Sequence, residues 1–266
     1  MNTINNLSII DPKAQIGKNV TISPYAIISG DVVIGDNCWI GPFVSVQDGV
    51  RMGKNCKIFQ GAIVGSIPQD LKFEGEESVL EIGDNTIIRE YCTLNRGTKA
   101  GYRTAIGSNC LLMAYVHVAH DCVVGNNVIL ANNVTLAGHI TIGDYAVLGG
   151  LTAVHQFVRI GAHVMIGGGS LVSKDVPPYI KASRNPLSYA GINSVGLSRR
   201  GFTPEQQQII TDIYRIIFVK GGVISESLKQ IETEFNDSAE RNNIIEFINH
   251  SERGLLKGLR NEVIEE

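Results

Sequence analysis

The 266-residue sequence is poor in aromatic residues and cysteine, has little net charge and lacks a long apolar run. Aromatic residues make up 6% of the chain but glycine occurs 29 times, so we expect a core of small and β-branched side chains. The five cysteines are an odd number without close pairs, which argues against a disulfide-stabilised secreted fold and favours the reducing cytoplasm.

The charge and hydropathy patterns also argue against a nucleic-acid-binding protein and a membrane-spanning protein. A net charge of −3 gives no indication of nucleic-acid binding. No apolar run approaches the ~18 residues that a transmembrane segment needs. The N-terminal "MNTINNLSII" has no basic region followed by a long apolar stretch, so no secretory signal is expected.

A six-residue repeat runs through most of the chain. Counted in sixes from Ile4, the first position holds Ile, Leu, Val or Met in three blocks, 4–64, 82–94 and 106–172. A period of six fits neither an α-helix nor an alternating strand, but it is typical of the hexapeptide parallel β-helix. Three hexads form one coil of a triangular prism, so residues 18 apart should stack on neighbouring coils. We predict a mainly β fold, a left-handed parallel β-helix of hexapeptide repeats with a small C-terminal α-helical domain.

The end of the repeat and its interruptions suggest the domain organisation. Residues 1–176 are predicted to form the β-helix, with loop insertions at 66–81 and 97–105, where the pattern is lost. Residues 177–200 contain four basic residues and no acidic one, and they are expected to be a connecting segment. Residues 201–266 are predicted to form the helical domain.

Start and stop signals place three helices in this C-terminal domain. Thr203-Pro204-Glu205 reads as an N-cap, a first-turn proline and an early acid, and Gly221-Gly222 should end that helix. A second helix is expected from about Ser225 and a third from Asp237 or Ser238.

The phase of each residue within its hexad predicts which way the side chain faces. The fifth position is otherwise Val or Ala and should face inward, so the cysteines there are expected to fill the core rather than act as redox thiols. These cysteines are Cys38, Cys56, Cys92, Cys110 and Cys122.

The same phase brings polar residues together on one ridge. His120 occupies a third position, and Asp121 and His139 occupy fourth positions, which face outward near the turn. Gly138 follows His120 by 18 residues, so the two should lie on neighbouring coils, with Gln156 one coil further. His250 lies in the tail and is expected to be on the surface.

These residue types suit acyl transfer. An imidazole such as that of His120 can accept a proton at neutral pH, and Asp121 can orient it. Gly138 has no side chain, so its N–H can approach a developing oxyanion closely. The alternative is a solvated histidine without function. No metal is predicted, because His117 and His120 should point to different faces and no acidic or cysteine pair completes a ligand set.

Several longer motifs point to one family. They are "IPQDLKF", "RGT", "HVAHDCVVGN", "LANNVTLAGHITIGD", "GGLTAVHQFVRIGAHVMIGG" and "DVPPY". With these motifs the chain resembles the UDP-N-acetylglucosamine O-acyltransferase family over essentially its whole length. The hexads alone are shared by many acyltransferases, whereas the stretch 117–168 is specific.

The resemblance implies an activity and a set of site residues. It implies transfer of a 3-hydroxyacyl chain from acyl carrier protein to the 3-hydroxyl of UDP-N-acetylglucosamine, the first step of lipid A biosynthesis. His120 matches the general base, Asp121 its orienting carboxylate, Gly138 the oxyanion amide and Gly168 a position that limits acyl length. The matched substrate-binding residues are Gln69, Asp70, Lys72, His117, His139, His155, Gln156, Asn193, Arg199 and Arg200.

The resemblance also implies partners. The family works as a homotrimer with sites between subunits. It needs no cofactor or metal, because its acyl donor is carried on acyl carrier protein. The basic segment 177–200 is a candidate landing zone for that acidic partner.

One residue departs from the family pattern. Asn95 precedes "RGT", where the family commonly has histidine, close to the acceptor sugar. This departure leaves a 3-amino UDP-sugar open as the acceptor. Two further alternatives for the scaffold as a whole are an acetyl-coenzyme A-dependent transferase and a non-catalytic or zinc-binding β-helix.

Overall fold

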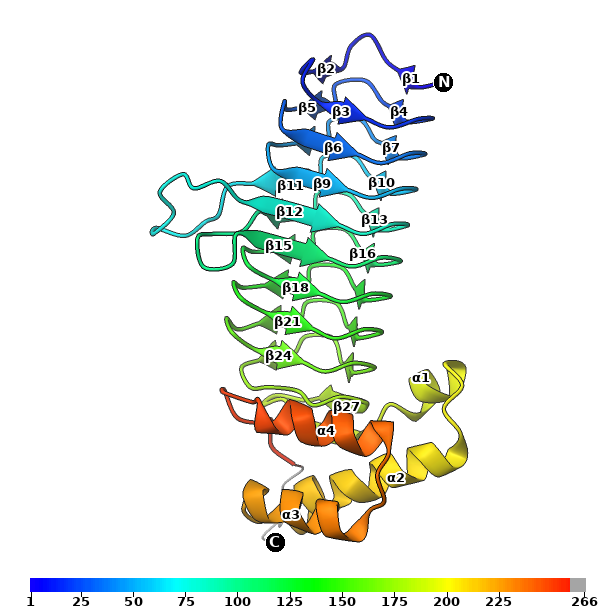
Figure 1. Ribbon diagram of the computed structural model, residues 1–266, viewed down its shortest axis with the longest axis vertical. Helices are drawn as coiled ribbons and strands as arrows, with labels where there is room; N and C mark the ends of the chain where they lie inside the picture. Colours follow the sequence, from blue (N-terminus) through cyan, green and yellow to red (C-terminus); the bar gives the residue numbers. More distant parts are fainter. Residues whose placement is uncertain (259–266) are drawn as a thin grey trace, which may run out of the picture.

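A computed structural model describes residues 1–258 as a long triangular prism of short strands with helices at its C-terminal end (Figure 1). The prism is a left-handed parallel β-helix with three sheets, as the hexads predict. Residues 259–266, the end of the predicted helical domain, lie outside the described residues.

Each hexad supplies one short strand, and successive strands go to the three sheets in turn. The 11-stranded sheet contains β1 (Thr3–Ile4), β4 (Thr21–Ile22), β7 (Trp39–Ile40), β10 (Lys57–Ile58), β13 (Ile87–Ile88), β16 (Leu111–Leu112), β19 (Ile129–Leu130), β22 (Val147–Leu148), β25 (Met165–Ile166), β27 (Ile180–Ser183) and β28 (Ser188–Ile192). The nine-stranded sheet contains β2 (Ile9–Ile10), β5 (Ile27–Ile28), β8 (Ser45–Val46), β11 (Ile63–Ser66), β14 (Thr93–Asn95), β17 (His117–Val118), β20 (Thr135–Leu136), β23 (Ala153–Val154) and β26 (Leu171–Val172). The eight-stranded sheet contains β3 (Gln15–Ile16), β6 (Val32–Ile34), β9 (Val50–Met52), β12 (Val79–Ile82), β15 (Arg103–Ile106), β18 (Val123–Val124), β21 (Thr141–Ile142) and β24 (Arg159–Ile160).

The strand register confirms the predicted spacing of 18 residues between coils. Val118 pairs with Leu136, and Leu136 pairs with Val154. The spacing grows only where a loop is inserted, as between Met52 and Ile82. Outside the loop insertions, two residues 18 positions apart in the sequence therefore lie next to each other on neighbouring coils.

The turns between strands depend on a left-handed backbone at the fourth hexad position. The φ angles of Asn109, Asp121 and His139 are 58°, 58° and 60°. L-residues reach this region at a cost of roughly 1–2 kcal/mol, least for Asn and Asp, so neighbouring coils must compensate. Side chains stacked at these corners do so, as in the hydrogen bond from Asn85 Nδ2 to Asn109 Oδ1 (3.2 Å).

The interior of the prism confirms that the fifth position faces inward and shows that the first position does so too. Leu112, Leu130 and Leu148 are buried. All five cysteines are free and buried, as predicted for core residues. Burial raises the pKa of the Cys122 thiol to about 12, so this thiol stays protonated at neutral pH.

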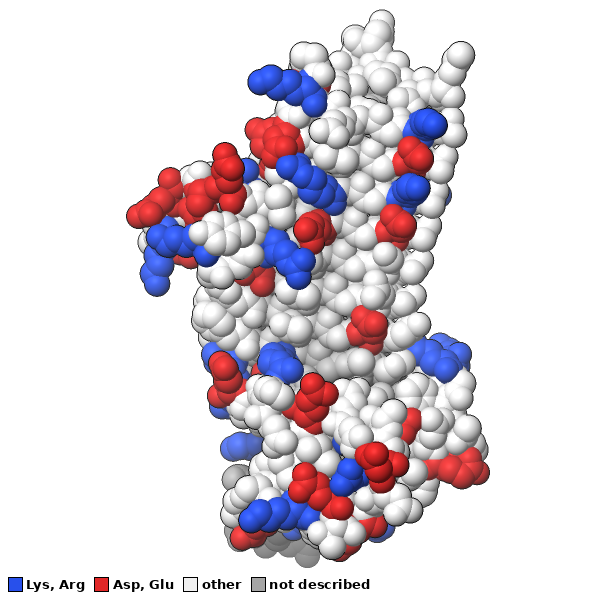
Figure 2. All heavy atoms as spheres, viewed as in Figure 1, with Lys and Arg blue, Asp and Glu red and all other residues white. Residues whose placement is uncertain are grey.

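Two excursions leave the prism on the side drawn at the left of Figure 1. The longer one spans 67–78, since β11 extends to Ser66 and β12 already begins at Val79. The shorter one spans 96–102. Lys99 joins them through an ion pair with Glu74 (3.2 Å). Figure 2 shows charged side chains gathered on the projecting loops and over the helical end.

The segment 177–200 is more structured than a linker. β27 continues the 11-stranded sheet, and β28 pairs with it antiparallel, which covers the hydrogen-bonding edge of the last coil. The helix α1 (Ser194–Arg199) follows. The repeat pattern carries no signal for these elements, because they interrupt its period.

The helical end matches the predicted start and stop signals. α2 (Pro204–Tyr214) begins with a capping box at Thr203 and continues as the π-helix η1 (Arg215–Lys220), which ends at Gly221. α3 (Ile224–Glu234) and α4 (Ala239–Asn249) follow, the latter capped by Ser238. None of the described helices is long and apolar enough to cross a membrane.

Candidate active site

His120 and Asp121 form the centre of a polar network at the corner that follows β17. His120 Nδ1 lies 2.8 Å from Asp121 Oδ2, and only 7% of the His120 surface is exposed. An ionised carboxylate only accepts hydrogen bonds, so the neutral imidazole carries its proton on Nδ1. Nε2 therefore presents a lone pair.

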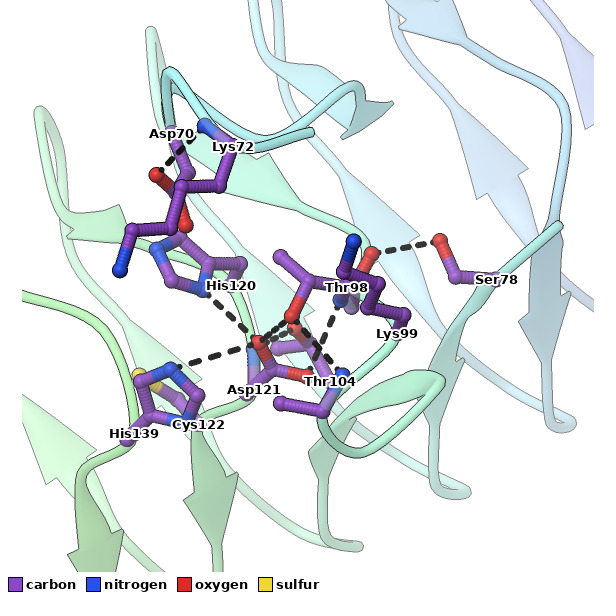
Figure 3. A network of polar contacts seen from close by, with 12 residues as sticks. Asp70, Lys72, Ser78, Thr98, Lys99, Thr104, His120, Asp121, Cys122 and His139 are labelled. Carbon is purple, nitrogen blue, oxygen red and sulfur yellow. Dashed lines mark hydrogen bonds and ion pairs between the residues drawn. The ribbon is translucent and has the colours of Figure 1, made fainter. Parts of the chain in front are cut away.

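Asp121 is held by the short loop 96–102 (Figure 3). Its carboxylate accepts hydrogen bonds from the Thr98 N–H (3.0 Å) and the Thr98 hydroxyl (2.7 Å), and its own N–H donates to Thr104 Oγ1 (2.8 Å). Burial acts to raise the pKa of Asp121, but hydrogen bonds from Thr98 and His120 outweigh it, so this pKa lies below its ordinary value. The carboxylate is thus ionised and fixed in place.

Gly138 lies directly beside the His120 ring on the next coil. A Cβ built on Gly138 would lie 2.7 Å from His120 Cε1 and 2.8 Å from Nε2, so only glycine leaves room for the ring. The His139 N–H donates to the His120 carbonyl (3.0 Å), which locks the two coils in register. Within residues 1–258 the Gly138 N–H donates to no backbone carbonyl.

His139 completes the corner. Its ring meets His120 edge-on with centroids 5.1 Å apart and stacks on Phe157 at 4.8 Å. Burial lowers the pKa of His139. Beside it lies a cleft of about 500 Å³ that reaches α4, lined by His139, Thr141, Phe157, Arg159, Glu246, His250 and Glu252.

The long loop brings its predicted residues to the same corner. Figure 3 shows Asp70 and Lys72 on this loop beside the His120 ring. Asp70 Oδ1 accepts a hydrogen bond from the Lys72 N–H (3.0 Å), which shapes the turn. Gln69 is exposed on the same segment.

The other predicted histidines lie close by in the prism. His117 is in β17, half-buried, and its Nδ1 lies 2.8 Å from Thr93 Oγ1. Burial lowers the pKa of His117. His155 and Gln156 follow β23 on the corner of His139, one coil further, and His155 is exposed.

The remaining predicted residues lie on other corners of the same chain. Asn193 caps α1 and donates to the His163 carbonyl (2.9 Å), and Arg199 ends this helix. The Arg200 guanidinium carbon lies 5.0 Å from the centroid of the Tyr145 ring, and Tyr145 belongs to the turn that follows β21. Gly168 follows β25 in a different sheet, where an added Cβ would lie 3.0 Å from a backbone oxygen. One chain alone therefore does not gather these residues around His120.

The sequence did not predict two contacts to Asp121, nor one group of possible metal ligands. Thr98 and Thr104 hold Asp121, although only the "RGT" motif hinted at Thr98. The metal argument considered His117 with His120, whereas the structure brings His120, Asp121 and His139 together with one donor atom each within 4.8 Å of one another. His139 lies on the next coil, so its distance along the sequence from His120 and Asp121 matches no metal-binding motif.

Asn95, the departure from the family pattern, is buried at the base of the long loop. It is 2% exposed and its Nδ2 donates to the Ile67 carbonyl (2.6 Å). Within residues 1–258 its Oδ1 has no hydrogen-bond partner. Its neighbour Leu94 pairs with Val118, so Asn95 lies one coil from the His120 turn.

A pH-dependent contribution to stability is expected at the corner that carries Arg200. His163 is stacked between Tyr145 and Tyr179, and burial together with Arg200 lowers its pKa to about 4. Between pH 6.5 and 4 the unfolded chain binds a proton at His163 that the folded chain does not, so acidification through this window destabilises the fold. The His163→Phe variant keeps the stacking without the proton, and its Tm should fall less than that of the parent between pH 7 and 5. Equal falls in both proteins would refute this.

Comparison with known proteins agrees with this description. Residues 175–256 match a family model described as UDP N-acetylglucosamine O-acyltransferase, domain 2, and residues 31–66 and 103–138 match bacterial transferase hexapeptide repeats. A protein of Chlorobium phaeobacteroides named acyl-[acyl-carrier-protein]–UDP-N-acetylglucosamine O-acyltransferase is 59% identical over 255 residues, 96% of this chain and 97% of that protein. A protein of the same name from Paracidovorax citrulli is 54% identical over 233 residues, 87% of this chain and 89% of that protein.

A solved structure shows the same fold over nearly the whole chain. The UDP-N-acetylglucosamine acyltransferase of Bacteroides fragilis is 49% identical and superimposes with a TM-score of 0.94 over 95% of this chain and 99% of that one. Identity at this level across the prism, loops and helices goes beyond a shared hexapeptide scaffold. The chain therefore belongs to the acyl-[acyl-carrier-protein]–UDP-N-acetylglucosamine O-acyltransferase family and is an acyltransferase.

Proposed function

We propose that this enzyme transfers a 3-hydroxyacyl chain from acyl carrier protein to the 3-hydroxyl of UDP-N-acetylglucosamine, in the first step of lipid A biosynthesis. The names of its relatives support the donor and the acceptor. One observation carries the mechanism: His120 has its Nδ1 bonded to Asp121, and the Nε2 side of its ring faces a bare glycine on the next coil.

In this proposal His120 acts as the general base. Its Nε2 takes the proton of the sugar hydroxyl as that oxygen attacks the thioester carbonyl, and Asp121 stabilises the imidazolium that forms. The Gly138 N–H donates to the oxyanion of the tetrahedral intermediate. When the intermediate collapses, the carrier thiolate leaves and receives the proton from His120. No cofactor or metal enters the scheme.

We further propose a homotrimer. The nine-stranded sheet and its corner with the 11-stranded sheet expose apolar side chains along the length of the prism, at Ile9, Tyr25, Ile27, Phe43, Ile63, Tyr91, Tyr115, Leu151 and Leu171. A stripe of this kind marks a protein interface. Copies packed along it would also bring the residues of other corners, Gly168, Asn193, Arg199 and Arg200, to the His120 site of a neighbour. Light scattering should then give three chains per particle.

The partner and compartment follow from the same proposal. Lys181 and Arg199 are exposed in the segment 177–200, which offers a basic surface to the acidic carrier protein. The five free thiols suit the reducing cytoplasm, where the carrier protein would meet the enzyme.

A 3-amino UDP-sugar is a second candidate acceptor. The buried Asn95 Oδ1 is an acceptor without a partner within residues 1–258, and an amine would offer it one more hydrogen than a hydroxyl does. The hydroxyl stays our first choice, because the relatives are named as O-acyltransferases.

Competition between the two acceptors distinguishes them. The enzyme is given two donors, 3-hydroxyacyl carrier protein and acetyl-coenzyme A, together with UDP-N-acetylglucosamine and its 3-amino analogue in equal amounts. Mass spectrometry then counts the products. We expect the ester to dominate. A dominant amide would select the second candidate, and an acetyl product from acetyl-coenzyme A in place of both would reject the carrier-protein donor.

A further inference from the structure

The corner around His120 offers three metal-ligand atoms that the acyl transfer does not use together. His120 Nδ1 lies 2.8 Å and His139 Nε2 lies 3.7 Å from the same atom, Asp121 Oδ2. One donor atom from each of the three residues lies within 4.8 Å of a donor atom of the other two. Ligands of a tetrahedral Zn²⁺ are roughly 3.3 Å apart when each bond is about 2.0 Å. The two separations from Asp121 Oδ2 differ from this value by only about half an ångström.

Neighbouring residues fix the orientation of these three side chains, as hydrogen-bonding and packing groups around known metal sites do for the ligands. Thr98 donates to both carboxylate oxygens of Asp121, through its N–H to Oδ1 and its hydroxyl to Oδ2. Phe157 stacks on the His139 ring and fixes its plane. His139 keeps 24% of its side-chain surface exposed beside the cleft, which leaves an entry path and room for a water as fourth ligand.

We propose that His120, Asp121 and His139 form an inhibitory site for Zn²⁺ or a similar divalent transition metal. Two imidazoles and one carboxylate form a donor set that suits Zn²⁺. The five thiols are buried in the prism and do not compete for the ion in the folded protein.

Inhibition follows from the tautomer of His120, and this step rests on the proposed function. An ion on Nδ1 takes the place of the proton that Asp121 accepts. The neutral imidazole must then carry its proton on Nε2, so it donates where catalysis needs an acceptor. Zinc would therefore stop proton removal without filling the space beside Gly138 where the substrate reacts.

Direct binding tests the site, independently of catalysis. The chelator-treated enzyme is titrated with Zn²⁺ against a chromophoric chelator, and Co²⁺ is used as a visible probe. We expect one ion per chain and a cobalt spectrum without a thiolate charge-transfer band. The His139→Phe variant, whose ring still stacks on Phe157, should bind Zn²⁺ at least ~100-fold more weakly, since losses in the outer shell alone give about 10- to 100-fold. Thr98→Val should fall within that outer-shell range.

His250→Gln is the matched control, because His250 is another exposed histidine that lines the same cleft but does not belong to the three-residue set. It should bind zinc as the parent does. Unchanged binding in His139→Phe, or a loss in His250→Gln equal to that in His139→Phe, would overturn the site.

Activity assays test the inhibitory step. The apparent inhibition constant for Zn²⁺ should rise in His139→Phe by the same factor as its dissociation constant, and a chelator should restore the parent rate. Full activity of the parent enzyme with the site occupied would overturn the inhibitory role. Activity of metal-free His120→Ala tests the proposed base separately, so failure of one idea is distinguishable from failure of the other.

Discussion

The His120→Ala variant is expected to transfer acyl chains about 100- to 10,000-fold more slowly than the parent enzyme, which is the usual contribution of a general base. The loss should appear in kcat, because the ring acts on the proton that moves in the transition state and the substrate contacts remain. Steady-state kinetics with 3-hydroxyacyl carrier protein and UDP-N-acetylglucosamine measures it.

The variant should still fold. It loses one hydrogen bond to the ionised Asp121, which contributes about 1.5–3 kcal/mol, and the Thr98 bonds continue to hold the carboxylate. Its oligomeric state should be unchanged. His250→Ala removes an exposed histidine and serves as the control with parental activity. Full turnover by His120→Ala would rule out this histidine as the base.

The Gly138→Ala variant is expected to lose about 100-fold or more in kcat. The new methyl group would lie 2.7–2.8 Å from the His120 ring, so the ring must move away from its position between Asp121 and the next coil. A displacement of about 1 Å at a reacting group is enough for a loss of this size. Gly138 is not among the residues with positive φ, so alanine fits its backbone and the protein should fold.

Gly30→Ala is the matched control for this substitution. Gly30 occupies the same third position of its hexad, and the atoms nearest to its added Cβ belong to the exposed Asp11 side chain, at 3.1 Å. The control should keep parental kcat and KM. If Gly138→Ala kept the parental kcat, catalysis would not require a glycine beside the His120 ring.

The part of the site that follows the repeat was predictable from the sequence. A fixed step of 18 residues placed His120 beside Gly138 and Asp121 beside His139, because every coil pairs with the next in the same register. The burial of the cysteines followed from the same phase. Because the pairing of the coils is regular, the number of residues between two positions predicts whether they are neighbours in space.

The rest of the site depends on segments without a period. The hydrogen bonds from Thr98 to Asp121 come from a loop whose path no repeat determines. β28 and α1 arise at the end of the prism, where an exposed sheet edge must be covered. The approach of His139 to Asp121 Oδ2 depends on side-chain orientation within the corner, which hexad phase does not specify.

The position of the acceptor sugar relative to His120 tests the central claim most directly. In a crystal structure of this enzyme with UDP-N-acetylglucosamine bound, we predict His120 Nε2 within ~2.6–3.2 Å of the sugar 3-oxygen, with Asp121 still on Nδ1. A sugar whose 3-oxygen lies out of reach of His120 and contacts a different base would contradict the account.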